Sequence, residues 1–94
     1  MEDRIISLFD TLYGRDFRSR AKKLREECLE LVEAIDNLSP APRLAEFDML
    51  IDEMADVEAV MTHVADLLHI DRERLLNMAV DKVEMRLLNP EHKR

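Results

Sequence analysis

The amino-acid sequence predicts an all-α protein in which four helices form a bundle-like domain. Apolar residues recur every three or four positions through nearly the whole chain, which is the period of an amphipathic helix. Only one glycine and three prolines occur among the 94 residues, and no segment alternates apolar and polar residues as a strand does. No linker-like stretch divides a chain of this length, so a single domain is expected over residues 1–94.

The ends of the first two helices follow from residues that cap or interrupt helices. The first helix is expected over about residues 3–13, because Gly14 can adopt the left-handed conformation of a C-terminal cap. Asp16 is a candidate N-cap for the second helix, since its carboxylate can accept a hydrogen bond from a free backbone N–H. Pro40 and Pro42 then interrupt the helical pattern, because neither fits the interior of a helix.

The second half of the chain contains two further helical segments. The third helix is expected over about residues 44–68, followed by a short connection. Asp71 can cap the fourth helix, which should reach about Leu88 and stop at Asn89 and Pro90.

Charge and composition exclude several classes of partner. The net charge of −7 repels nucleic acid and anionic lipid, so neither is an expected partner. The sequence has no apolar run of membrane-spanning length and no leader-like start, so a soluble cytoplasmic protein without a membrane partner is expected. Cys28 is the only cysteine, which excludes an intrachain disulfide, and its place in an apolar stripe predicts a buried, unreactive thiol.

Two pairs of acidic residues occupy matching positions beside the apolar stripes of the second and third helices. They are Glu27 and Glu30 in the second helix, and Glu53 and Asp56, 26 residues further on, in the third. If the two helices pack as an antiparallel pair, these four carboxylates should meet at one rim of the shared core. Clustered carboxylates repel each other and lose hydration, and a hard divalent cation such as Mg²⁺ offsets both costs. The alternative is a solvated acidic surface, because 21 acidic residues also produce such pairs by chance.

The segments around these acids resemble the metal-binding helices of the MazG-type nucleoside triphosphate pyrophosphohydrolases. Residues 23–35, with Glu27-x-x-Glu30, are similar to the first such helix, and residues 52–57, with Glu53-x-x-Asp56, are similar to the second. Residues 79–86 are similar to the family's fourth-helix segment. The likeness covers about residues 20 to 88, although Leu29 and Ala55 stand where family members often have glycine.

The resemblance implies a MazG-type fold and hydrolysis of (deoxy)nucleoside triphosphates to a nucleoside monophosphate and pyrophosphate, with nucleotide-pool control as the cellular role. It implies Mg²⁺ as cofactor, with Mn²⁺ as a substitute, held by Glu27, Glu30, Glu53 and Asp56. One carboxylate, Glu27 or Glu30, would orient the attacking water. The residues expected to face the phosphates are Lys82 and Arg86, with help from Lys23. The resemblance also implies a homodimer or homotetramer.

Two alternatives to this interpretation remain open from the sequence. Phosphoribosyl-ATP pyrophosphatases share the acidic motifs, so the nucleotide is not fixed by these residues. A non-catalytic helical interaction module, or a nucleotide-binding module with an acidic face, is the competing class.

Other residues are expected to have structural or solvated roles. His63 falls on the polar side of the third helix and is expected at the surface, with a position next to the metal-binding acids as the alternative. Four methionines at helical spacing are expected to fill the core, with a self-association face as the alternative, and they are Met54, Met61, Met78 and Met85. A basic N-terminal run is expected to be solvated, with attraction of a polyphosphate as the alternative, and it comprises Arg15, Arg18, Arg20, Lys22, Lys23 and Arg25.

Overall fold

The computed structural model describes residues 1–89 and contains four α-helices in this part of the chain. They are α1 (Glu2–Tyr13), α2 (Phe17–Asp36), α3 (Leu44–Leu67) and α4 (Arg72–Leu88). No strand occurs among these residues, so the all-α prediction is confirmed, and each helix begins and ends within one or two residues of its predicted bounds. Pro90, which was expected to stop the last helix, lies outside the described residues.

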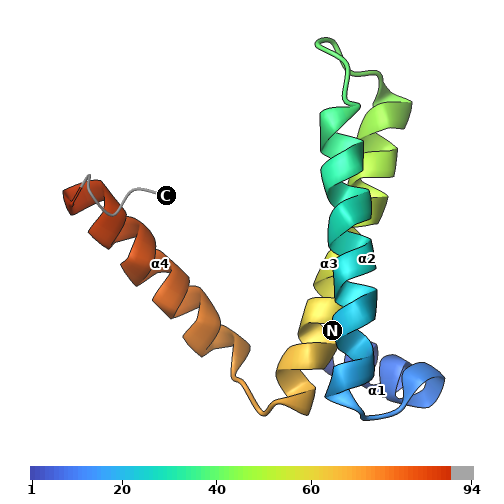
Figure 1. The fold of residues 1–94 in the computed structure, drawn as a ribbon, viewed down its shortest axis with the longest axis vertical. Helices are drawn as coiled ribbons and strands as arrows, with labels where there is room; N and C mark the ends of the chain where they lie inside the picture. The colour runs from blue at the N-terminus through green and yellow to red at the C-terminus, as the bar shows by residue number, and fades with distance from the viewer. Residues whose placement is uncertain (90–94) are drawn as a thin grey trace.

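Helices α2 and α3 form a long antiparallel hairpin, which Figure 1 shows as the cyan and yellow-green pair. Asp16 caps α2 as predicted, because its carboxylate accepts a hydrogen bond of 3.1 Å from the Arg18 backbone N–H. The connection between the two helices is held by Glu46, whose carboxylate accepts hydrogen bonds from the backbone N–H and the hydroxyl of Ser39. These bonds stabilise the carboxylate and hold the pKa of Glu46 below its ordinary value.

Helix α1 lies across the end of the hairpin where α2 begins and α3 ends (Figure 1). Its Phe9 meets the ring of His63 in α3 edge to face, with 5.4 Å between ring centroids. Arg15, just after the helix, forms ion pairs with Asp10 at 2.8 Å and with Asp66 of α3 at 3.0 Å. Gly14 makes the turn between α1 and α2 with a positive φ of 74°, a conformation that glycine adopts without steric cost.

Helix α4 extends away from the hairpin instead of packing along it (Figure 1). His69, in the connection before it, has a φ of 56°, and Arg72 at its start forms ion pairs with Glu58 at 2.6 Å and with Glu2 at 3.4 Å. The radius of gyration is 16.0 Å, compared with roughly 12 Å expected for a compact chain of this length. The four helices therefore do not enclose a common core within one chain.

The packed face of the α2–α3 hairpin is rotated from the predicted apolar stripes toward the acidic side of each helix. On α2 the least exposed residues are Arg20, Lys23, Leu24, Glu27, Leu31 and Ala34. On the hairpin part of α3 they are Glu46, Leu50, Glu53, Val57, Ala59 and Val60. Glu27 and Glu53 consequently lie within the helix–helix contact, whereas Glu30 and Asp56 stay exposed at its rim.

This rotation corrects two further expectations. Cys28 is exposed, because it lies on the side of α2 that turned outward, so the predicted buried thiol is wrong. The four methionines predicted to fill the core are also exposed, Met54 to 52% and Met85 to 61%. Helices α3 and α4 therefore present exposed apolar side chains on their outward faces. None of the helices in the described part of the chain has the length and apolarity that a membrane span requires.

Candidate metal centre

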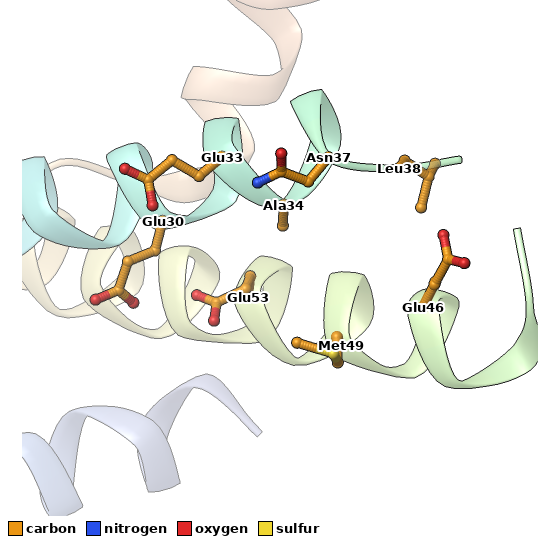
Figure 2. Close-up of a pocket in the computed structure, with 8 residues that line it drawn as sticks. All are labelled: Glu30, Glu33, Ala34, Asn37, Leu38, Glu46, Met49 and Glu53. Carbon is orange, nitrogen blue, oxygen red and sulfur yellow. The ribbon is translucent and has the colours of Figure 1, made fainter. Parts of the chain in front are cut away.

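The hairpin brings together the four acidic residues that the spacing singled out. Glu27 and Glu30 reach from α2, and Glu53 and Asp56 reach from α3. One carboxylate oxygen from each lies within 4.8 Å of the corresponding oxygen of every other residue in the group. Figure 2 shows two of them, with the Glu30 side chain crossing from α2 toward α3 and the Glu53 carboxylate turned toward it. A matched pair of helical positions thus becomes a single cluster of oxygen atoms.

Two of these carboxylates carry buried oxygens without partners. Glu27 is only 5% exposed, and its Oε1 accepts an ion-pair contact of 3.0 Å from Lys23 Nζ, one helical turn earlier. Its second oxygen, Oε2, is buried and accepts no hydrogen bond, and the same is true of Glu53 Oε2. A buried oxygen without a partner is costly, so these two oxygens lack a positive or donating group, even though Lys23 contacts the other oxygen of Glu27.

The pKa values of two carboxyl groups in the cluster, those of Glu53 and Asp56, are raised. Burial raises the pKa of Glu53 above its ordinary value, and the neighbouring Glu30 carboxylate raises it further. Burial also raises the pKa of Asp56, with a second contribution from Glu27. The positive charge of Lys23 lowers the pKa of Asp56 and so partly offsets these effects. The pKa of Lys23 itself is raised by its hydrogen bond to Glu27. One lysine does not balance four carboxylates.

Two cavities flank the cluster. One, of about 300 Å³, lies between α2 and α3 on the side toward their connection, and Figure 2 shows the residues that line it. Glu30, Glu33 and Glu53 lie toward one end of it, and Glu46 lies toward the other (Figure 2). The other cavity, of about 340 Å³, lies on the α1 side and is lined by Phe9, Tyr13, Arg20, Lys23, Glu27, Asp56 and Val60. Each cavity therefore reaches one pair of the acidic cluster.

The comparison with family models identifies the domain. The model for the MazG nucleotide pyrophosphohydrolase domain matches residues 15–89. The chain belongs to the MazG family. No curated protein and no solved structure matches the chain.

The MazG match begins after α1, so it includes the acidic cluster and α4 but leaves out the first helix. Phe9 and Tyr13, which line the second cavity, therefore belong to a part of the chain outside the matched domain. In this MazG domain Lys23 lies at the cluster, whereas Lys82 and Arg86 do not. Both are on α4, which leaves the hairpin, so one chain does not bring them to its own carboxylates (Figure 1).

Two residues of this region were misjudged from the sequence. His63 was expected at the surface but is fully buried, because α1 covers the polar side of α3 and provides Asp10 as a partner for the ring. Arg20 was expected to be solvated with the rest of the basic run, yet it is 7% exposed and lines the second cavity. No local pattern identifies either residue, because their burial depends on where the preceding helix docks.

Proposed function

We propose that this MazG domain hydrolyses (deoxy)nucleoside triphosphates to a nucleoside monophosphate and pyrophosphate in a Mg²⁺-dependent reaction, and so contributes to nucleotide-pool control. The observation that carries the proposal is the convergence of Glu27, Glu30, Glu53 and Asp56 on one point between two helices. The family match supports the reaction class. Hydrolysis would break the anhydride bond between the α- and β-phosphates, with water adding to phosphorus and pyrophosphate leaving.

The residues present fit a hard divalent cation. All four donors are carboxylates, the ligand type that Mg²⁺ prefers, and Mn²⁺ accepts the same oxygen ligands. The buried Oε2 atoms of Glu27 and Glu53 have no hydrogen-bond partner, which is the condition a bound cation would relieve. A cation at this site supplies positive charge that polarises the phosphate and favours attack by water.

Within the cluster, we assign Glu30 the role of orienting the attacking water and accepting its proton. Glu27 is buried and already engaged by Lys23. Glu30 is exposed, lies at the end of a cavity and forms no ion pair among residues 1–89. A carboxylate that water can reach is better placed for general base catalysis than one that is buried and paired. Glu27 is therefore assigned as a ligand of the cation, and Glu30 as both a ligand of the cation and the general base for the attacking water.

Self-association is part of the proposal, as a homodimer or homotetramer. The chain exposes 7864 Å², whereas the scaling for compact monomers gives roughly 5600 Å² at this mass. Helix α4 carries an exposed apolar stripe at helical spacing, formed by Leu76, Val80, Val83 and Leu87. A second copy packed on these surfaces would bury them.

The same association would explain the distant basic residues. Lys82 and Arg86 are separated by one helical turn and lie on the projecting helix. In a dimer, α4 of one copy can lie beside the hairpin of the other, which would present both cations to the partner's carboxylates and bound phosphates. We therefore propose that each active site combines acids from one chain with Lys82 and Arg86 from the other.

The test is a panel of ribo- and deoxyribonucleoside triphosphates, including phosphoribosyl-ATP, with Mg²⁺ or Mn²⁺ and separate detection of pyrophosphate and phosphate. We expect release of pyrophosphate that EDTA abolishes. Glu53→Gln should reduce turnover at least about a hundredfold, because the variant loses one of four ligands. Asp48→Asn, which removes an exposed charge from the same helix, should retain the wild-type rate. Nucleotide binding without pyrophosphate release would instead indicate a non-catalytic binding module.

A further inference from the structure

Arg20 is a buried cation without an acidic partner among residues 1–89. It is 7% exposed, and its Nε and Nη1 atoms are buried and donate no hydrogen bond. Among residues 1–89 no carboxylate lies within ion-pair distance of its guanidinium group, although Arg15 and Lys23 on either side both have acidic partners. An unpaired buried charge is expensive, and a guanidinium group presents a planar fork of donors that matches carboxylate and phosphate oxygens.

The guanidinium group is held in place by an aromatic ring from α1. Its central carbon lies 4.1 Å from the centroid of the Tyr13 ring, within the range of a cation–π interaction. Phe9 also contacts Tyr13, because the two rings meet edge to face with 5.3 Å between their centroids. One face of Tyr13 is therefore covered by Arg20, so this ring is a platform for the guanidinium group and that face does not receive a nucleobase.

The cavity that Arg20 lines reaches the acidic cluster. Glu27 and Asp56 form part of its wall, and Lys23 contributes a second cation. Lys23 forms an ion pair with Glu27 Oε1, so its charge already neutralises an acid of the cluster. The charge of Arg20 is not neutralised by any carboxylate of the described residues. The cavity on the opposite side of the cluster contains Glu33 and Glu46 and has no basic residue in its lining. Of these two cavities, the one on the α1 side has basic residues in its lining and is the better placed to receive an anion.

We infer that Arg20 binds phosphate oxygens of the triphosphate, and that Tyr13 is the positioning residue that orients its guanidinium group. This inference rests on the proposed function, because the anion it names is the polyphosphate of that substrate. It also gives the substrate a direction: the phosphates enter the α1 side, and the nucleoside lies away from it. The competing explanation is that Arg20 only offsets the negative charge of the cluster from a distance.

Calorimetric titration with inorganic tripolyphosphate and with pyrophosphate, in saturating Mg²⁺, separates these explanations without any need for turnover. We expect Arg20→Gln to weaken binding of both anions by about tenfold to a hundredfold, the value of charge-assisted hydrogen bonds to phosphate. Arg18→Gln is the matched control, because it removes the same charge from an exposed position in the same helical turn. Arg20→Lys should bind with intermediate affinity, since it keeps the charge and loses the planar fork.

Two further measurements make the outcome decisive. Titration with Mg²⁺ alone should give the same affinity in Arg20→Gln as in the wild type. If the variant instead changes the affinity for Mg²⁺ and leaves the affinity for both anions unchanged, Arg20 only offsets the negative charge of the acidic cluster. Tyr13→Leu should weaken anion binding, whereas Tyr13→Phe, which keeps the ring, should restore it. Circular dichroism melting of each variant checks that it is folded.

The inference and the proposed function fail in different ways. If Glu53→Gln binds Mg²⁺ as the wild type does, the metal centre is wrong, and Arg20 is then tested by the same anion titrations in EDTA. If Mg²⁺ binding behaves as proposed but Arg20→Gln and Arg18→Gln bind tripolyphosphate equally well, the role of Arg20 is overturned and the metal centre stands.

Discussion

His63 donates a hydrogen bond of 2.8 Å from Nε2 to Asp10 Oδ1 and thereby ties α3 to α1. The histidine is fully buried, and the bond holds the pKa of Asp10 below its ordinary value. Helix α1 carries Phe9 and Tyr13, which line the cavity on one side of the acidic cluster. The position of that wall therefore depends on a contact between a residue at position 10 and one at position 63.

His63→Ala should lower the free energy of unfolding by about 2–4 kcal/mol, because it opens a cavity and removes the hydrogen bond to α1. Chemical denaturation measures the change. His69→Asn is the control: His69 is exposed and has a positive φ, which asparagine tolerates. Equal stability of the two variants would show that the His63–Asp10 bond does not hold α1 in place.

Magnesium should stabilise the folded protein in a saturable way. Since the four carboxylates converge only in the folded chain, the cation binds the folded state, and at a hundred times its dissociation constant the gain is about 2.7 kcal/mol. Thermal melting at constant ionic strength should show a rise of several degrees. Glu30→Gln should shrink this rise while preserving or raising the melting temperature without metal, because one repulsive charge is gone.

Glu33→Gln is the matched control for that experiment. Glu33 is exposed on the same helix, one turn beyond Glu30, and lies outside the cluster. It should respond to Mg²⁺ as the wild type does. The same response from Glu30→Gln would remove Glu30 from the set of ligands.

Without metal, stability should fall as the pH rises above about 4.5. The pKa values of Glu53 and Asp56 are raised in the folded state from ordinary values of 4.5 and 3.8. A carboxyl group with a raised pKa holds its proton more tightly when folded, so its stabilising contribution is complete below the unfolded pKa and is lost as pH rises through the folded one. Glu53→Gln should therefore flatten the dependence of melting temperature on pH above 4.5.

Saturating Mg²⁺ should reverse this dependence, because the cation binds the ionised carboxylates and competes with protons. Melting curves in EDTA and in Mg²⁺ across this pH range make the comparison. A wild-type slope in EDTA that Glu53→Gln leaves unaltered would mean that this carboxylate does not experience the burial and repulsion described above.

Two inactive variants should complement each other if the active site is shared between chains. Glu53→Gln removes an acid, and the double variant Lys82→Ala/Arg86→Ala removes the bases contributed to the partner. Random mixing of the two as dimers leaves half of the dimers mixed, each with one intact site, so activity should recover to roughly one quarter of wild type. Pyrophosphate release after unfolding and refolding the mixture together measures the recovery.

The control for complementation is a change on the α4 stripe. Val80→Glu/Val83→Glu in both chains should lower the mass measured by light scattering and abolish the recovery, whereas Asn77→Glu, an exposed position off the stripe, should not. Absence of recovery in a mixture that remains dimeric would place Lys82 and Arg86 outside the partner's site.

The sequence alone predicted the number of helices and most of their ends, because these depend on local chemistry. Asp16 and Asp71 cap helices with their own side chains, and Gly14 turns the chain with a conformation that suits glycine. The spacing also singled out the four acids, because a helical period fixes which side chains share a face. These features need no knowledge of distant contacts.

Only the tertiary structure decided which face of each helix is buried. An amphipathic stripe fixes the contact to within a wide arc, and the hairpin packed toward the acidic edge of that arc, so Glu27 is buried and Cys28 is exposed. The burial of Arg20 and His63 was likewise decided by the docking of α1, which places Tyr13 against Arg20 and Asp10 against His63, 53 positions away. The placement of α4 away from the hairpin separates Lys82 and Arg86 from the acids, although all of them lie on regular helices. Helical periodicity specifies which side chains share a face of one helix. The site depends on how the axes of several helices are placed relative to one another.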